Sequence, residues 1–336
     1  MKIKVFIISA VSLIVVGLTV AIVTLAANQF KIGELTEELV PNTYSIEGEF
    51  NSIECDLDTA DVDILYISEG ESFVSSLEND KISFTVEVVD GVLKITENTK
   101  IENWYDFFNW SSVCVDLYIN KNAFASVTIK NDTGDINILD AFKIDNLLID
   151  SDTSNINLSG LEVKSLDSNI STGDFYIENS SITSLKSKTS TGESKIRNCK
   201  VLENVTIEAS TGKIYLENFE IGGKLHVTVS TGKIEISETT CDSYESSSST
   251  GTVKLTDLVV TTDINIKTST GDVKLNSIDA ANIYIKTSTG DVTGTIRSDK
   301  IFFLDSNTGK EDSPFSTTGG ICKVTTDTGD ITLDYE

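Results

Sequence analysis

The sequence is poor in histidine, proline and cations. It holds one histidine and two prolines in 336 residues, and its 26 lysines and arginines are outnumbered by 52 aspartates and glutamates. A single histidine argues against a histidine-based metal site or acid–base centre. The formal net charge of −26 disfavours nucleic acid and anionic lipid or wall polymers as partners, unless cations bridge them, because like charges repel.

Catalytic and cofactor motifs are missing as well. The sequence contains no Walker loop, no GxSxG, no HExxH and no paired CxxC. The single histidine, His226, stands between two apolar residues, so strand alternation places it on the outside as an ordinary surface residue. We therefore predict that the protein is not an enzyme and holds no cofactor.

The cysteines form no recognisable redox or metal motif. Their odd number and wide spacing favour buried free thiols, with disulfides as the alternative. The five residues are Cys55, Cys114, Cys199, Cys241 and Cys322.

A short phrase repeats along most of the chain. Residues 264–275 read INIKTSTGDVKL, and residues 283–293 read IYIKTSTGDVT. The threonine–glycine step recurs every 19 or 20 residues, with Ser154 in the glycine place of one copy. A fixed period of this length is typical of a solenoid. The glycines are Gly134, Gly173, Gly192, Gly212, Gly232, Gly251, Gly271, Gly290, Gly309 and Gly329.

Apolar residues alternate on both sides of this step, which predicts two half-buried strands per repeat. The steps Thr270–Gly271 and Thr289–Gly290 are the predicted structural turns, with glycine supplying a positive φ. Successive repeats would stack about 4.8 Å apart. The predicted fold class is therefore all-β, a parallel β-helix or β-solenoid with rungs of 19–20 residues.

One membrane-spanning helix is predicted before the repeats. Lys2 and Lys4 precede an uncharged run over residues 5–27, which is long enough to cross a bilayer. Positive charge on the short side predicts a cytoplasmic tip at residues 1–4 and an extracytoplasmic remainder. We thus expect a single-pass protein of the cell membrane, anchored by residues 5–27. A cleaved signal peptide is the alternative, since small residues follow Thr24.

The remaining chain divides into three predicted parts: a linker at 28–43, an irregular N-terminal β capping region at 44–119, and regular solenoid repeats at 120–336. Residues 50–65 already resemble a repeat, with Ala60 in the glycine place. A cap is expected because an open solenoid end exposes unpaired backbone groups.

An aromatic segment interrupts the capping region and holds both tryptophans of the chain. It is interpreted as a contact loop for a membrane interface, a glycan or a protein partner, or else as a hydrophobic lid over the first rungs. The candidate contact residues are Trp104, Tyr105, Phe107, Phe108 and Trp110.

The chain from about residue 44 to its end is similar to a known family. A strand, a short link and then SVTIKNDTGDINI, followed by TGD-type repeats behind one membrane segment, resembles the bacterial putative-adhesin domain family of unknown function. The proline–lysine pair common in that family is absent, since Asn120 precedes Lys121 here. The resemblance implies an extracytoplasmic β-solenoid, sometimes associated with envelope-stress systems of Gram-positive bacteria, and it transfers no catalytic residues.

Two functions are compared on this basis. We expect a membrane-anchored, non-catalytic binding or scaffold module, an adhesin or cell-envelope stress component whose partners are envelope proteins or glycans. The alternative is a carbohydrate-active β-helix enzyme that uses surface carboxylates. No metal site is predicted. The alternative is a calcium site at Asp272 and Asp291, which lie on adjacent repeats. Without calcium, these two aspartates would stabilise a solvent-exposed turn.

Overall fold

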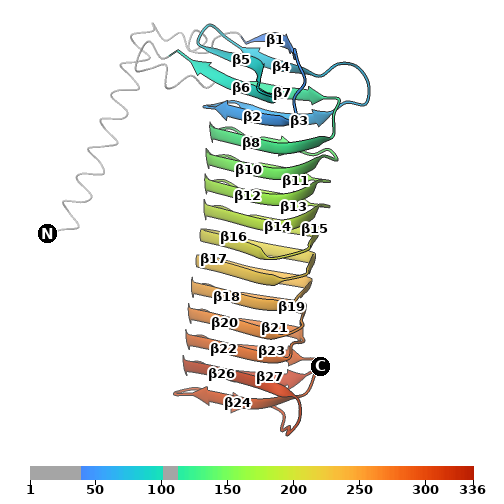
Figure 1. Cartoon of the computed structure of the whole chain (residues 1–336). Coiled ribbons are helices and arrows are strands. Elements are labelled where there is room, and N and C mark those ends of the chain that lie inside the picture. The colour runs from blue at the N-terminus through green and yellow to red at the C-terminus, as the bar shows by residue number, and fades with distance from the viewer. Residues whose placement is uncertain (1–38, 101–112) are drawn as a thin grey trace, which may run out of the picture.

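The predicted all-β solenoid is confirmed. The structure, a computed structural model, describes residues 39–100 and 113–336, and every regular element in those two ranges is a β-strand (Figure 1). The strands are β1 (Val40–Ser45), β2 (Ser52–Leu57), β3 (Asp61–Tyr66), β4 (Phe73–Glu78), β5 (Ile82–Val89), β6 (Val92–Thr99), β7 (Cys114–Ile119), β8 (Ala123–Thr133), β9 (Ile136–Ile138), β10 (Lys143–Thr153), β11 (Ile156–Ser159), β12 (Glu162–Thr172), β13 (Phe175–Glu178), β14 (Ser181–Thr191), β15 (Ser194–Val201), β16 (Val205–Ile221), β17 (Lys224–Cys241), β18 (Ser243–Thr250), β19 (Val253–Val260), β20 (Asp263–Thr270), β21 (Val273–Ile278), β22 (Asn282–Thr289), β23 (Val292–Ile296), β24 (Lys300–Ser306), β25 (Glu311–Asp312), β26 (Gly320–Thr328) and β27 (Ile331–Tyr335).

Each rung is two stretches of strand joined at the threonine–glycine corner. In one rung β20 leads into the corner and β21 leaves it, and both pair in parallel with the equivalent strands of the neighbouring rungs. The pairing keeps equivalent residues opposite one another, so Thr270 stands opposite both Thr250 and Thr289. The rungs therefore stack as a rod (Figure 1).

Apolar side chains at alternate positions fill the inside of this rod. In the same rung Ile264 and Val273 are completely buried and Leu275 is almost so. One rung cannot cover these side chains by itself, because its core lies open above and below. Burial and backbone hydrogen bonding are thus shared between neighbours, as expected for a repeat protein.

Glycine is required at the corner for two reasons. Gly271 has φ of 145°, where residues with a side chain are strained. A Cβ added to it would lie 2.0 Å from the carbonyl oxygen of Gly251 on the neighbouring rung. In the same way, a Cβ added to Gly290 would lie 2.2 Å from the carbonyl oxygen of Gly271. The corners therefore stack backbone directly on backbone.

The N-terminal end does not stack in chain order. The rung formed by β2 and β3 lies between the rung formed by β6 and β7 and the one formed by β8 and β9. Residues 50–65 are thus a full rung, as their sequence indicates, and Ala60 lies under Gly134 at the corner. Outside it, β1, β4 and β5 add antiparallel pairings that the inner rungs lack.

A buried glutamate fastens this end together. Glu97 of β6 is only 6% exposed, and its carboxylate accepts the backbone N–H groups of Asp58, Thr59 and Ala60 at 2.9, 2.8 and 3.1 Å. The carboxylate thus provides hydrogen-bond acceptors, from the neighbouring rung, for the backbone N–H groups in the turn between β2 and β3. Three charge-assisted hydrogen bonds are strong ones by protein standards.

At the C-terminal end, the last two rungs stack in the reverse of their chain order. The final strands β26 and β27 pair with β22 and β23 on one side and with β24 and β25 on the other. The last residues of the chain therefore lie inside the stack, while β24 is outermost (Figure 1). Hydrogen bonding on both sides holds the chain end in place.

Within the described ranges, no helix has the length and apolar character needed to cross a membrane. The predicted span at residues 5–27 falls outside those ranges.

We expect Gly271→Ala to lower the free energy of unfolding by about 2–4 kcal/mol, because it adds both backbone strain and a clash with Gly251. Chemical unfolding followed by circular dichroism measures the loss. Ser269→Ala, an exposed change two residues away, is the control and should stay within about 0.5 kcal/mol. Equal stability of the two variants would contradict the stacked-corner model.

Candidate binding groove

A second corner forms six residues after the glycine place. The residue at this corner has φ between 49° and 60° in six successive rungs, which is the left-handed conformation. Asparagine adopts it more readily than most residues with a side chain. The six residues are Asn179, Asn198, Asn218, Glu238, Asp257 and Ser277.

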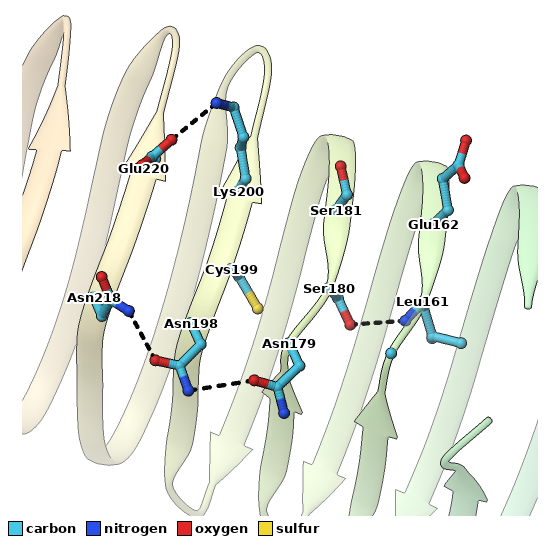
Figure 2. A pocket seen from close by; sticks show the side chains of 11 residues that line it. Leu161, Glu162, Asn179, Ser180, Ser181, Asn198, Cys199, Lys200, Asn218 and Glu220 are labelled. Atoms are coloured by element: carbon cyan, nitrogen blue, oxygen red, sulfur yellow. Dashed lines mark hydrogen bonds and ion pairs between the residues drawn. The ribbon is translucent and has the colours of Figure 1, made fainter. Parts of the chain in front are cut away.

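The three asparagines form a ladder across neighbouring rungs. The side-chain amide of Asn198 donates to Oδ1 of Asn179 at 3.3 Å, and that of Asn218 donates to Oδ1 of Asn198 at 2.9 Å (Figure 2). Each rung contributes the same group in the same orientation, because the rungs are in register. The corner therefore presents a row of amides at the rung spacing.

This ladder runs along a groove of about 630 Å³. Figure 2 shows the lining side chains coming from successive rungs, with the asparagines along one side and charged groups along the other. The lining residues are Gly160, Leu161, Glu162, Asn179, Ser180, Ser181, Asn198, Cys199, Lys200, Asn218 and Glu220.

The charged groups of the groove are paired. Lys200 contacts Glu220 at 2.9 Å, and Glu162 contacts Lys143 at 2.8 Å. What remains for a ligand is amide and hydroxyl chemistry, which suits a ligand rich in hydroxyl groups.

The cysteine in the groove is not a nucleophile at neutral pH. Cys199 is 3% exposed, and its thiol donates to the carbonyl oxygen of Arg197 at 3.1 Å. Burial raises its pKa to about 11, so the reactive thiolate is scarce.

Aromatic and cationic side chains lie on the sheet face beside the groove. Lys195 and Arg197 approach the ring of Tyr215, with 5.5 Å and 5.7 Å to its centroid. Arg197 also pairs with Glu217 at 2.6 Å. These contacts hold a flat aromatic surface against the rod, next to the amide ladder.

The aromatic contact residues predicted from the sequence lie outside the described ranges. Trp104, Tyr105, Phe107, Phe108 and Trp110 fall in the segment between β6 and β7. Their role as contact loop or lid stays a prediction.

The two calcium candidates have a backbone partner. Oδ1 of Asp272 accepts the backbone N–H of Asp291 at 3.2 Å, and Oδ1 of Asp291 accepts that of Asp330 at 2.8 Å. Each carboxylate thus satisfies the amide that follows the corner glycine of the next rung. Among the residues that the structure describes, no cluster of three or more potential metal ligands occurs.

His226 lies on the outside, as expected, beside Thr228 and Glu245. The five cysteines are free thiols, buried except for the half-buried Cys114.

The asparagine corner was missed in the sequence. The signal was present, because asparagine recurs at 179, 198 and 218, one repeat apart. It could not be interpreted without knowing that the chain turns at these residues and that they line a groove.

The class of protein is thus an all-β solenoid with a polar groove along one corner. The family model "Toastrack DUF4097" matches residues 50–254, and the chain belongs to this family. No curated protein matches the chain.

Solved structures of low identity are similar over most of the chain. A structure from Parabacteroides merdae described as "a putative adhesin" is 17% identical, with a TM-score of 0.39, covering 76% of this chain and 97% of its own. One from Bacteroides fragilis, also described as "a putative adhesin", is 14% identical, with a TM-score of 0.31 and coverage of 89% and 97%. A "putative lipid binding protein" from Parabacteroides distasonis is 15% identical, with a TM-score of 0.36 and coverage of 78% and 97%.

Buried thiols predict a loss of stability in alkali. Burial raises the pKa of Cys199 to about 11 and the pKa values of Cys55, Cys241 and Cys322 to about 12, against 9.0 ordinarily. The unfolded chain therefore ionises first, and stability present below pH 9 is lost as the pH rises. We expect a fall of about 1 kcal/mol per pH unit for each thiol above pH 9.

Urea unfolding at pH 8 to 10.5 measures this slope. Cys241→Ala should make it shallower by one thiol's share, independently of its effect on absolute stability. An unchanged slope in that variant would contradict the assignment.

Proposed function

We propose that the protein is a membrane-anchored, extracytoplasmic binding module without catalytic activity, whose groove takes a hydroxyl-rich glycan of the cell envelope. The observation that carries this proposal is the groove itself: a row of neutral amides at the rung spacing, with its charged residues already paired. A periodic row of hydrogen-bonding groups suits a periodic, extended ligand better than a small compact one.

The chemistry of the groove favours binding over hydrolysis. A glycosidase needs two carboxyl groups with separate roles. The two groove carboxylates, Glu162 and Glu220, are each held by a lysine, and the thiol of Cys199 is protonated at neutral pH. The carbohydrate-active alternative therefore gains no support from this site.

The location is supported by the sequence. Residues 5–27 are uncharged over a bilayer-spanning length, with lysines on the short N-terminal side. An extracytoplasmic rod would present its groove to wall or surface polymers, as an adhesin or an envelope-stress component would need.

Removing the amide ladder should weaken glycan binding without unfolding the protein. Glycine tolerates the left-handed corner, so the triple variant Asn179→Gly, Asn198→Gly and Asn218→Gly deletes the amides while keeping the backbone. On an array of neutral envelope glycans, we expect the full-length chain in nonionic detergent to bind and the triple variant to bind at least about tenfold more weakly.

Glu238→Gly is the matched control, since it makes the same exchange at the next corner outside the groove. Binding of no glycan, or equal loss in variant and control, would refute the groove as the ligand site.

The membrane topology is tested on intact cells. We expect an antibody epitope at the C-terminus to be accessible from outside, and alkaline carbonate to leave the protein in the membrane fraction with residues 1–27 retained by mass. Release of a shorter chain would assign the segment to a cleaved signal peptide, and an inaccessible epitope would overturn the proposed location.

A further inference from the structure

Six lysines and one arginine on the solenoid faces pair with an acid on a neighbouring rung. The pairing follows from the register, which places one rung's side chains beside those of the next. The cross-rung pairs include Lys94–Glu54, Lys143–Glu162, Lys164–Asp145, Lys186–Asp167, Arg197–Glu217, Lys200–Glu220 and Lys224–Glu245.

Three exposed lysines near the C-terminal end have no such partner and lie close together on successive rungs. Lys267 of β20 stands directly opposite Lys286 of β22, and Lys323 of β26 stands opposite Tyr284. In the described part of the chain, none of these three ammonium groups has an ion pair or hydrogen bond. Equal charges placed opposite each other on paired strands destabilise the fold.

Neighbouring acids relieve this repulsion only in part. Glu245, on the next rung inward, is paired with Lys224 and attracts Lys267 from beyond ion-pair distance, but Lys286 has no acid opposite it. Asp305, on the outermost rung, stands opposite Thr325 rather than opposite a lysine.

Other lysine pairs on the rod differ in this respect. Lys213 stands opposite Lys233, but Lys233 pairs with Glu235 on its own strand at 3.0 Å. Similarly, Lys274 opposite Lys254 pairs with Asp272 at 3.5 Å. Among the residues that the structure describes, this C-terminal group alone combines an opposed lysine pair in which neither lysine has an ion pair with a third unpaired lysine. The whole chain has a net charge of −26.

An aromatic ring lies among these cations. Tyr284 is two residues from Lys286, so both side chains point out of the same sheet face. It is half-buried and lies beside Lys323 on the next rung, and exposed Phe303 follows Lys323 one rung further out. A flat ring flanked by cations can stack on a sugar ring while the lysines meet its acidic groups.

We infer that Lys267, Tyr284, Lys286 and Lys323, here called the lysine strip, bind a linear acidic polysaccharide. The cations lie on three successive rungs, which are about 4.8 Å apart, and so follow the rod, which suits a linear polymer carrying repeated carboxylate or sulfate groups. Single-stranded nucleic acid fits less well, because it is bound on aromatic side chains that stack successive bases, and the strip holds one ring, Tyr284. The strip lies on other rungs than the groove and does not depend on it.

The test measures binding of the full-length chain in nonionic detergent to immobilised polygalacturonate, heparin, poly(glycerol phosphate), single-stranded DNA and neutral dextran. We expect binding to polygalacturonate or heparin, weakening as salt rises because exposed charges are screened, and none to dextran. The triple variant Lys267→Gln, Lys286→Gln and Lys323→Gln should bind at least about tenfold more weakly.

The matched control is Lys143→Gln, Lys164→Gln and Lys186→Gln, which removes the same total charge from lysines that are paired. It should change affinity by less than about twofold. Equal loss in both triples would overturn the strip in favour of bulk charge. So would absence of binding to either polysaccharide, or tighter binding to poly(glycerol phosphate) or DNA.

Two further variants separate a binding role from a structural one. Tyr284→Ala should weaken polysaccharide binding. Lys286→Gln should weaken it too, yet raise the melting temperature of the free protein, because it removes the repulsion with Lys267. A lower melting temperature for Lys286→Gln would overturn the proposed repulsion. The glycine variants of the asparagine ladder should bind the acidic polymer like the unaltered protein. The experiments therefore test the groove and the lysine strip independently.

Discussion

Stacking of backbone on backbone at the threonine–glycine corner is the constraint on which the rest depends. The carbonyl oxygen of each corner comes within about 2 Å of where the next corner's Cβ would be, as at Gly271 over Gly251. This closeness allows only glycine at most corners and fixes the vertical alignment of the rungs. Equivalent residues outside the corner then stand in register, and where an aspartate follows the glycine, as at Asp272 and Asp291, its carboxylate accepts the following rung's amide.

Strict register gives the surface its character. Each outward side chain has an equivalent as neighbour, so amides can join into ladders, as at Asn198, and opposite charges on neighbouring rungs can pair, as in Lys200–Glu220. In the lysine strip like charges meet instead. The groove and the strip are both products of register, one by repeating a compatible group and the other by repeating an incompatible one.

Both ends of the rod stack rungs out of chain order. At the C-terminal end the chain skips a rung position, forms the outer rung and returns to fill the gap with β26–β27. At the N-terminal end β2–β3 comes first, and the chain then moves outward to β6–β7 and crosses back to β8–β9. In both cases the inner rung is paired on both sides. At the N-terminal end Glu97 adds hydrogen bonds across the exchanged rungs. This places chain segments near both ends of the described solenoid inside the hydrogen-bonded stack, where they resist fraying.

The sequence by itself determined the fold class, the rung length, the glycine corners and the rung at residues 50–65, because each depends on residue types recurring at a short, fixed spacing. Only the tertiary structure decided the exchanged rung order at both ends. The repeats have similar sequences, so the sequence of one repeat does not specify which other repeat pairs with it. It also decided the asparagine groove and the unpaired state of Lys267, Lys286 and Lys323. Those features depend on the bend of the chain and on which side chains from different rungs become neighbours.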